Sequence, residues 1–322
     1  MPTSFSIAVV VALAAAIYFI VRRDNYLLPE IEVVKVPPVV ENVEYRIFAV
    51  GDCHGDLDAT LKILEMAGIV DEHRNWAANN SILVQTGDIV DRGPDTIALY
   101  KLFQSLTQQA EAQNGKVVSL LGNHEIMNMM GHLQYVDPRD VHSFGNPAKR
   151  AREWSIEGDL GKYLRSLDTF TVVKQNLFIH AGLHPKYAIE NINQIIRNLL
   201  NQNQIQLHEI LIGEDSPTWY RGYALGSEDT VCPLLSETLK KMGAKRMIVG
   251  HTPQLSGKIF TRCVMPLTME GPVEPRLYVI DLGISAAYGS TAQGLIEIIK
   301  GLESERVFVN GVYFSGKEML NF

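Results

Sequence analysis

Short apolar runs that each end in a polar residue recur along this sequence and constrain its fold more than any other feature. The run YRIFAV leads into Gly51 and Asp52, and the run SILVQT leads in the same way into Gly87 and Asp88. Continuous apolar runs of this length are typical of strands that are buried on both faces. Four more runs follow the pattern: KVVSLL, NLFI, RMIV and RLYVI lead into Gly122-Asn123-His124, His180, Gly250-His251 and Asp281-Leu282-Gly283.

Helical patterns occupy the segments between these runs. Residues 57–67 carry apolar side chains at helical spacing, and either Asp56 or Asp58 can cap this helix. Residues 187–200 and 234–242 are also expected to be helical. The alternation of strands and helices predicts an α/β fold, in which ligands gather at the carboxyl ends of the strands. The final runs GLIEIIK and RVFVNGVYF are joined by a short link and are expected to pair antiparallel.

The composition excludes several classes of protein. The chain has 322 residues, of which 46% are hydrophobic and 20% charged, so it is long enough for one large globular domain or two small ones. A formal net charge of −7 argues against a nucleic-acid partner. Cys53, Cys232 and Cys263 form no paired spacing, so we expect neither a disulfide framework nor a cysteine-based zinc site. The cysteines do not fix the cellular compartment.

The N-terminus differs from the rest of the chain. Residues 5–21 carry no charge and are followed by Arg22 and Arg23. A membrane-spanning helix needs about 20 apolar residues, and no basic residue precedes this run as it does in most signal peptides. We therefore expect a single-pass membrane anchor over residues 1–24, with a cleaved signal segment as the alternative. The arginine pair favours a cytosolic catalytic domain, and a secreted or luminal domain is the alternative.

A linker is expected between this anchor and the catalytic domain. Residues 25–44 contain Pro29 and the pair Pro37-Pro38, which favour an extended chain. The catalytic domain is then expected to span residues 45–322.

The polar residues at the ends of the apolar runs form a candidate metal site. Oxygen and imidazole ligands without a thiolate suit Mn, Fe or Zn better than calcium. One carboxylate can bridge two ions, so six side chains suffice for a two-metal centre. Each residue taken singly is better explained as a turn, cap or core residue, but turn chemistry does not readily explain the whole set. The candidate ligands are Asp52, His54, Asp88, Asn123, His180 and His251.

Two arginines and a histidine supply the other parts of a phosphoryl-transfer site. Arg92 lies in the segment DRG and Arg221 in WYRG. Arginine clamps phosphate oxygens bidentately, although an isolated arginine is more often part of a surface ion pair. His124 directly follows Asn123 and can act as a general acid, with Asp91 as the carboxylate that orients it.

Taken together, these motifs resemble the metallophosphoesterase superfamily. The segments GDCHG, GDIVDRG, GNHE and VGH match its serine/threonine phosphoprotein phosphatase branch in order and spacing, and LLGNHEIMNMMGHLQYV and TWYRGYA are most similar to the Shewanella-like protein phosphatases. The resemblance covers roughly residues 45–289. It implies a calcineurin-like fold, which is a β-sandwich of two mixed sheets flanked by helices.

The resemblance also implies two bound metal ions, of Mn, Fe or Zn, and assigns a role to each candidate. Arg92 and Arg221 would bind substrate phosphate, and His124, paired with Asp91, would be the general acid. The segment ISAAYG loosely resembles a substrate-groove loop, so Tyr288 is a candidate groove residue. No regulatory subunit can be inferred. The implied ligands of the first metal are Asp52, His54 and Asp88, and those of the second are Asp88, Asn123, His180 and His251.

The sequence therefore predicts a metal-dependent phosphatase of phosphoproteins. A hydroxide activated by the two metal ions would attack phosphorus while His124 protonates the leaving oxygen, and the choice between Ser/Thr and Tyr phosphates stays open. A polyphosphatase or a dinucleoside polyphosphate hydrolase is the alternative, because these share the metal core. The substrates of these enzymes are polyanions, which need a basic groove. The insert 139–165 instead mixes basic and acidic residues and is interpreted as a solvated loop and helix. A catalytically dead scaffold is disfavoured because every candidate ligand is present.

Overall fold

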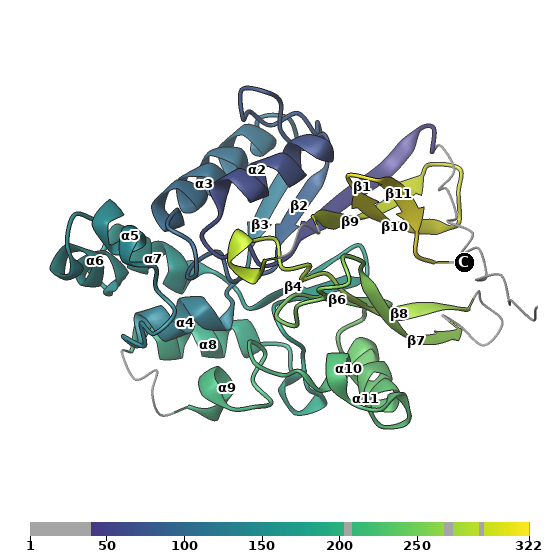
Figure 1. Ribbon diagram of the computed structural model, residues 1–322. Coiled ribbons are helices and arrows are strands. Elements are labelled where there is room, and N and C mark those ends of the chain that lie inside the picture. Colours follow the sequence, from purple (N-terminus) through teal and green to yellow (C-terminus); the bar gives the residue numbers. More distant parts are fainter. Residues whose placement is uncertain (1–39, 203–207, 267–272, 290–292, 322) are drawn as a thin grey trace, which may run out of the picture. The chain divides into compact units, whose positions relative to one another are not determined.

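The computed structural model of this chain describes residues 40–202, 208–266, 273–289 and 293–321 (Figure 1). The predicted membrane anchor and most of the predicted linker lie outside the described residues, so both stay predictions. Within the described part of the chain, no helix combines the length and the apolar content that a membrane crossing requires.

In the part of the chain that the structure describes, eleven strands form two β-sheets, whose arrangement Figure 1 shows. The six-stranded sheet has the order β11-β10-β9-β1-β2-β3, and the five-stranded sheet has the order β4-β5-β6-β8-β7. The first comprises β1 (Val43–Val50), β2 (Ile82–Gln85), β3 (Lys116–Ser119), β9 (Gly294–Gly301), β10 (Val307–Tyr313) and β11 (Gly316–Met319). The second comprises β4 (Phe170–Val173), β5 (Asn176–Ile179), β6 (Arg246–Val249), β7 (Phe260–Pro266) and β8 (Val273–Val279).

Both sheets are mixed, which confirms the predicted sandwich of two mixed sheets. In the first sheet β1 pairs in parallel with β2 and antiparallel with β9. In the second sheet β5, β6 and β8 run parallel, with β4 and β7 antiparallel at the edges. The expected antiparallel pairing of the last two apolar runs is confirmed, because β9 pairs with β10 in this way.

A continuous apolar core joins the two sheets. Ile47 and Val84 from the first sheet share one buried cluster with Phe178, Ile248 and Tyr278 from the second. Burying a side chain of this size stabilises the fold by roughly 1.5–3 kcal/mol. Each parallel strand therefore ends beside the same core, which places the polar residues that follow these strands close together.

Helices flank both sheets, with α2 and α3 beside the first sheet and α10 and α11 beside the second (Figure 1). The Asp56 side chain accepts a hydrogen bond from the amide of Ala59 and caps α2, as one of the two predicted alternatives. The helices are α2 (Leu57–Met66), α3 (Thr96–Glu111), α4 (Asn123–Met129), α5 (Pro138–Ser143), α6 (Pro147–Trp154), α7 (Asp159–Ser166), α8 (Ile192–Asn201), α9 (Glu209–Ile212), α10 (Gly222–Leu225) and α11 (Glu228–Lys241), with short 3-10 turns η1 (Pro185–Tyr187) and η3 (Ala286–Tyr288).

Helix α11 begins at Glu228 rather than near residue 234 as the sequence predicted. Pro233 lies inside it, in the second turn, where the ring removes one backbone hydrogen bond. Packing outweighs this cost, because Val231, Leu235 and Leu239 are buried on one face of the helix.

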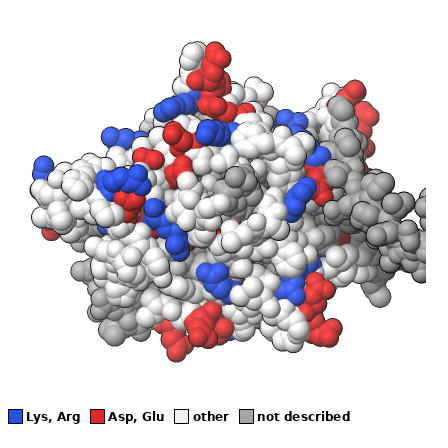
Figure 2. Space-filling model, viewed as in Figure 1, with Lys and Arg blue, Asp and Glu red and all other residues white. Residues whose placement is uncertain are grey.

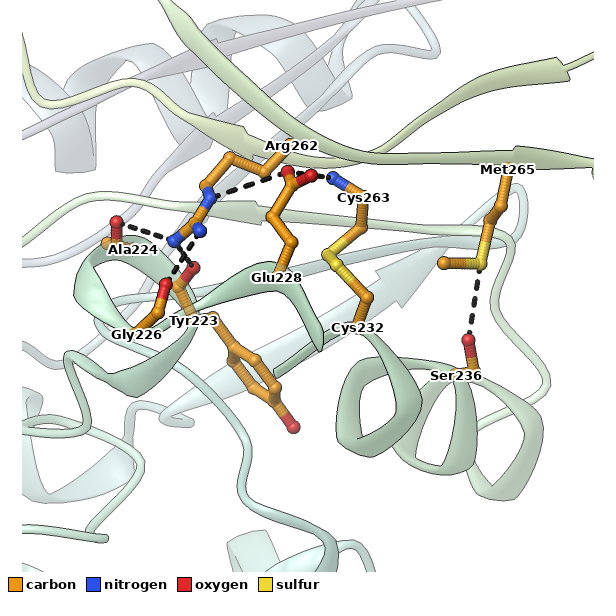
Figure 3. The surroundings of a disulfide bond; sticks show 9 residues. All are labelled: Tyr223, Ala224, Gly226, Glu228, Cys232, Ser236, Arg262, Cys263 and Met265. Atoms are coloured by element: carbon orange, nitrogen blue, oxygen red, sulfur yellow. Dashed lines mark hydrogen bonds and ion pairs between the residues drawn. A yellow bond between two sulfur atoms is a disulfide. The ribbon is translucent and has the colours of Figure 1, made fainter. Parts of the chain in front are cut away.

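A disulfide between Cys232 of α11 and Cys263 of β7 corrects the prediction that the cysteines do not pair (Figure 3). The two Cα atoms lie 5.4 Å apart although 31 positions separate the residues in sequence. The side chain of Glu228 accepts a hydrogen bond from the amide of Cys263 beside this bond. The fold rather than the spacing brings the cysteines together, so the sequence carried no signal. Cys53 is free and buried in the core.

Replacing both Cys232 and Cys263 with alanine is expected to lower the free energy of unfolding by about 3–4 kcal/mol, because the 31-residue loop then regains entropy in the unfolded chain. Urea denaturation with and without a reductant measures this difference. The reductant should destabilise the wild type and leave the double variant unaffected. A wild-type midpoint that ignores the reductant would contradict the disulfide.

Candidate active site

The six predicted metal ligands all lie within four residues of the end of a strand. Asp52 and His54 follow β1, and Asp88 follows β2. Asn123 begins α4 just after β3, and the remaining two ligands follow β5 and β6 of the second sheet. All six side chains are buried: Asp52, His54, Asp88, Asn123, His180 and His251.

Asp88 lies at the centre of this cluster. Its Oδ2 atom is 3.3 Å from Nε2 of His180 and 3.8 Å from Nε2 of His54. The His180 Nε2 atom is in turn 2.9 Å from Oδ1 of Asn123 and 3.0 Å from Nδ1 of His251. Two groups of side chains that could each hold an ion share Asp88: one is His54, Asp88 and His124, and the other is Asp88, His180 and His251. This is the arrangement that a bridging carboxylate requires.

The hydrogen bonds of two histidines leave ring nitrogens that could bind cations between these groups. Nδ1 of His54 lies 2.9 Å from the carbonyl oxygen of Val90, and Nδ1 of His180 lies 2.9 Å from that of Thr86. A carbonyl only accepts hydrogen bonds, so both Nδ1 atoms carry a proton, and in the neutral imidazole both Nε2 atoms then present lone pairs. These lone pairs converge on the carboxylate of Asp88, which has no proton to offer at neutral pH. Acceptors facing acceptors need a cation between them.

The backbone around the ligands is strained. His54, Asp88 and His251 have positive φ angles of 43°, 54° and 63°. Such conformations cost of order 1–3 kcal/mol each in a residue other than glycine and cluster at functional sites. Gly55 also has a positive φ of 66°, and a Cβ atom there would lie 2.4 Å from the carbonyl oxygen of Gly93. Glycine is therefore required at position 55, where the backbone turns tightly beside the ligands.

Glu125 supports the loop of Asp88, and the sequence reasoning missed it. Its buried carboxylate accepts hydrogen bonds from the amides of Asp88 and Gly122 at 3.0 and 2.7 Å. It also accepts from the amide of Ile89 and the hydroxyl of Tyr100, both at 2.9 Å. Burial raises the pKa of Glu125, and the charge of Asp88 adds to this rise. A glutamate at the third position of a helix is the sequence signal of such a cap.

His124 and Asp91 form the predicted pair. Nδ1 of His124 lies 2.6 Å from Oδ2 of Asp91, and Nε2 lies 3.8 Å from Oδ2 of Asp88. Burial lowers the pKa of His124, but the charge of Asp88 and the hydrogen bond to Asp91 outweigh burial, so the pKa is raised. The ring therefore favours the protonated form with one N–H directed at the metal cluster.

Comparison with known proteins agrees with this geometry. Residues 45–255 match the family model of calcineurin-like phosphoesterases. The chain belongs to the calcineurin-like phosphoesterase family. The resemblance that the motifs indicated is thereby confirmed, and the protein is a phosphoesterase-type hydrolase with a buried His/Asp cluster suited to two metals.

Relatives of this phosphoesterase include the Shewanella-like phosphatases. The chain is 39% identical to an uncharacterised protein of Schizosaccharomyces pombe, with 80% of each chain covered. It is 28% identical to Shewanella-like protein phosphatase 2 of Arabidopsis thaliana, covering 79% of this chain and 74% of the relative. The solved cold-active protein-tyrosine phosphatase of a psychrophilic Shewanella species is similar with a TM-score of 0.68 and 25% identity, over 89% of this chain and 83% of that one.

The guanidinium of Arg92 in this phosphoesterase lies against two aromatic rings. The guanidinium carbon lies 4.9 Å from the ring centre of Tyr288 and 5.1 Å from that of Tyr135. The two tyrosine rings also contact the rings of His54 and His124. The structure thus brings the predicted groove residue Tyr288 to the site and adds Tyr135, whose side chain is 42% exposed. No periodic pattern marks Tyr135, because it lies in a loop between α4 and α5.

Arg221 reaches the second metal group. Its Nη1 atom donates to the carbonyl oxygen of His251 at 2.6 Å. Arg221 directly precedes α10, and Arg262 donates to the carbonyls of Tyr223 and Ala224 within that helix (Figure 3). Arg262 therefore holds the helix on which Arg221 depends. Both predicted arginines border the metal cluster.

Asp281 is a further carboxylate that the ligand prediction omitted. It follows β8 directly, is fully buried, and accepts a hydrogen bond from the amide of Gly283 at 3.0 Å. Burial raises its pKa to about 6. The charge of Asp281 in turn adds to the effect of burial, which raises the pKa of Asp52 well above its usual value. Bound cations would relieve this repulsion between carboxylates.

Replacing Glu125 with glutamine is expected to weaken metal binding by about 10–100-fold, as loss of an outer partner does at other metal sites. The amide group of glutamine places a donor against backbone N–H donors that the carboxylate now satisfies. Competition titration with a chelator measures the affinity. Glu65→Gln, an exposed glutamate in α2, is the matched control. Unchanged affinity in the Glu125 variant would remove its supporting role.

Proposed function

We propose that this phosphoesterase is a metal-dependent protein phosphatase that hydrolyses phosphomonoesters of Ser, Thr or Tyr. The observation that carries this proposal is the placement of His124, whose Nδ1 lies 2.6 Å from Oδ2 of Asp91 and whose Nε2 faces Asp88 of the metal cluster at 3.8 Å. An acid at this point can protonate the leaving oxygen of a monoester. Arg92, beside it, can hold the phosphate.

The residues at the strand ends would hold two cations of Mn, Fe or Zn. Two bound cations supply a water acidified to act as nucleophile and positive charge for the phosphate oxygens. The proposed ligands of one cation are Asp52, His54 and Asp88, and those of the other are Asp88, Asn123, His180 and His251.

The other residues of the site bind the substrate and move a proton. Arg92, fixed between two tyrosine rings, and Arg221 bind phosphate oxygens and stabilise the charge that develops on them. His124 donates its Nε2 proton to the departing oxygen. Asp91 accepts the Nδ1–H of His124, which fixes the tautomer and stabilises the charged ring.

The site accepts phosphotyrosine as well as phosphoserine and phosphothreonine in this proposal. The rings of Tyr135, an exposed residue, and Tyr288 both lie beside Arg92 and provide aromatic surface there. A phenyl ring bearing the phosphate can stack on such a wall, which contributes about 0.5–1.5 kcal/mol. The similar solved structure is of a protein-tyrosine phosphatase, in keeping with this proposal.

A polyphosphate or dinucleoside polyphosphate substrate fits the described surface less well. Arg150, one of three neighbouring basic residues in the insert, is buried and paired with Asp140 rather than free for a polyanion. On the face shown in Figure 2, basic and acidic side chains are interspersed rather than gathered into one basic patch.

We propose that residues 1–24 anchor this phosphatase to a membrane and that its partner is a phosphoprotein. The Cys232–Cys263 disulfide favours the luminal or extracellular alternative over the cytosolic side, because disulfides persist mainly in oxidising compartments.

A comparison of substrates after metal loading tests the proposed function. The protein is loaded with Mn, Zn or Fe, and turnover is measured on phosphoserine, phosphothreonine and phosphotyrosine peptides, on polyphosphate and on diadenosine tetraphosphate. The peptides are expected to have the highest kcat/KM. A wide preference for either polyphosphate would overturn the protein-phosphatase assignment.

His124→Asn is expected to lower kcat on an alkyl phosphate by about 10²–10⁴-fold, because the leaving alkoxide then departs without a proton. Metal content, measured by mass spectrometry, should stay unchanged because Nε2 of His124 is not among the proposed ligands. An unaltered rate on this poor leaving group would exclude His124 as the acid.

A further inference from the structure

Arg150 lies inside the protein, although the insert around it was expected to be solvated. Its side chain in α6 is 2% exposed, whereas Lys149 and Arg152 of the same helix are exposed. Burying a guanidinium is costly unless hydrogen bonds and an opposite charge compensate for the lost water. The position of Arg150 therefore needs an explanation in terms of its partners.

The Arg150 side chain has hydrogen-bond partners and aromatic contacts inside the protein. Its Nε atom donates to Oδ2 of Asp140 at 3.0 Å, and its Nη2 atom donates to Oδ1 of Asn128 at 2.8 Å. The guanidinium also lies over the rings of Phe144 and Trp154, at 5.5 and 5.0 Å from their centres. Arg150 is thus held rigidly between α5, α6 and α4.

Asn128 connects Arg150 to the catalytic pair. The Asn128 side chain is buried, and its Nδ2 atom donates to Oδ1 of Asp91 at 2.9 Å and to the carbonyl oxygen of His124 at 2.9 Å. An amide has one donor end and one acceptor end, and arginine offers only donors. Arg150 therefore forces Oδ1 of Asn128 toward itself and Nδ2 toward Asp91. In the reversed orientation Oδ1 would face the carboxylate of Asp91, acceptor against acceptor.

The orientation of Asp91 follows from this contact. Its Oδ1 atom is engaged by Asn128 and its Oδ2 atom by Nδ1 of His124. A carboxylate bonded at both oxygens cannot rotate freely, so the plane of the His124 ring is fixed and Nε2 stays directed at the metal cluster. Positioning of a catalytic group to within about 0.5 Å contributes directly to rate.

We propose that Asn128 and Arg150 are positioning residues of the general acid. The chain of contacts runs from Asp140 through Arg150, Asn128 and Asp91 to His124, and it links the helical insert α5–α6 to proton transfer. This inference rests on the proposed function for its kinetic consequence, because it concerns the residue that protonates the leaving oxygen.

Dependence on the leaving group distinguishes positioning of the acid from general damage. Asn128→Ala and Arg150→Met are compared with Arg152→Met, an exposed arginine of the same helix, in the full-length metal-loaded protein. Phenyl phosphate releases a phenol with a pKa of about 10, like tyrosine, and needs the acid. Dinitrophenyl phosphate releases a much more stable phenolate and needs it little.

The two variants are expected to lose about 10–100-fold in kcat on phenyl phosphate, part of what general acid catalysis supplies, and less than about 3-fold on dinitrophenyl phosphate. Arg152→Met should match the wild type on both substrates. Equal losses on both substrates, or no loss on either, would overturn the proposal. If Arg150→Met does not fold, as judged by circular dichroism, Asn128→Ala decides, because it leaves the Arg150–Asp140 pair intact.

A spectroscopic readout separates this inference from the proposed function. The Nδ1 proton of His124, held by Asp91, is expected to give a downfield imidazole signal in proton NMR, identified by its absence in His124→Asn. In Asn128→Ala this signal should broaden or disappear through faster exchange with water. A signal unchanged in Asn128→Ala overturns the positioning role. A wild type that hydrolyses neither aryl phosphate overturns the proposed function alone.

Discussion

The candidate metal site depends on one electrostatic feature: several lone pairs converge around the carboxylate of Asp88 and repel one another. In the neutral imidazoles of His54 and His180, whose Nδ1 atoms donate to carbonyl oxygens, the Nε2 lone pairs face carboxylate and amide oxygens. Burial aggravates the conflict: it lowers the pKa of His54 to about 4, and it raises the pKa of Asp52. The interior thus disfavours the charged form of either group. Bound cations resolve this conflict, because each satisfies several lone pairs at once.

The fold and the local backbone serve to maintain this convergence. The shared core of the two sheets brings the ends of parallel strands to one place, and the residues that follow them adopt strained conformations at Asp88 and His251. Four donors that point at Glu125, including the amide of Asp88, hold one of these strained turns. Surrounding residues also hold the proposed general acid His124 in place. There the orientation of the Asn128 amide depends on the buried guanidinium of Arg150.

Much of the site could be predicted from the sequence because the chemistry is local to strand ends. Asp52, Asp88 and His180 each directly follow, or follow by a residue or two, an apolar run that the structure shows as a strand. Parallel pairing of β1 and β2 brings Asp52 and Asp88 together, and the packing of the two sheets adds His180 from β5. The arrangement of two mixed sheets, by contrast, came from the resemblance to a family, since apolar periodicity does not say which strands pair.

What could not be predicted depends on contacts between segments far apart in the chain. Cys232 and Cys263 meet only because α11 packs on β7. In the sequence, Arg150 lies in an insert of both basic and acidic residues and is expected to be solvated. Only the packing of α5 and α6 shows that it is buried against Asn128. The position of Glu125 in GNHE is recognisable as a helix cap. Its hydrogen bonds to the amides of Asp88 and Ile89, however, join segments that follow two different strands, and no sequence pattern predicts such contacts.

Metal stoichiometry tests the central claim most directly. Full-length wild type, Asp88→Asn and the exposed control Asp58→Asn are loaded with metal, freed of excess ions, and measured by inductively coupled plasma mass spectrometry. The account predicts about two ions per chain in the wild type and in Asp58→Asn, since a shared carboxylate builds a two-metal centre. It predicts fewer than one in Asp88→Asn, because both ligand groups share this residue. Two ions retained in Asp88→Asn, or none bound by the wild type, would contradict it.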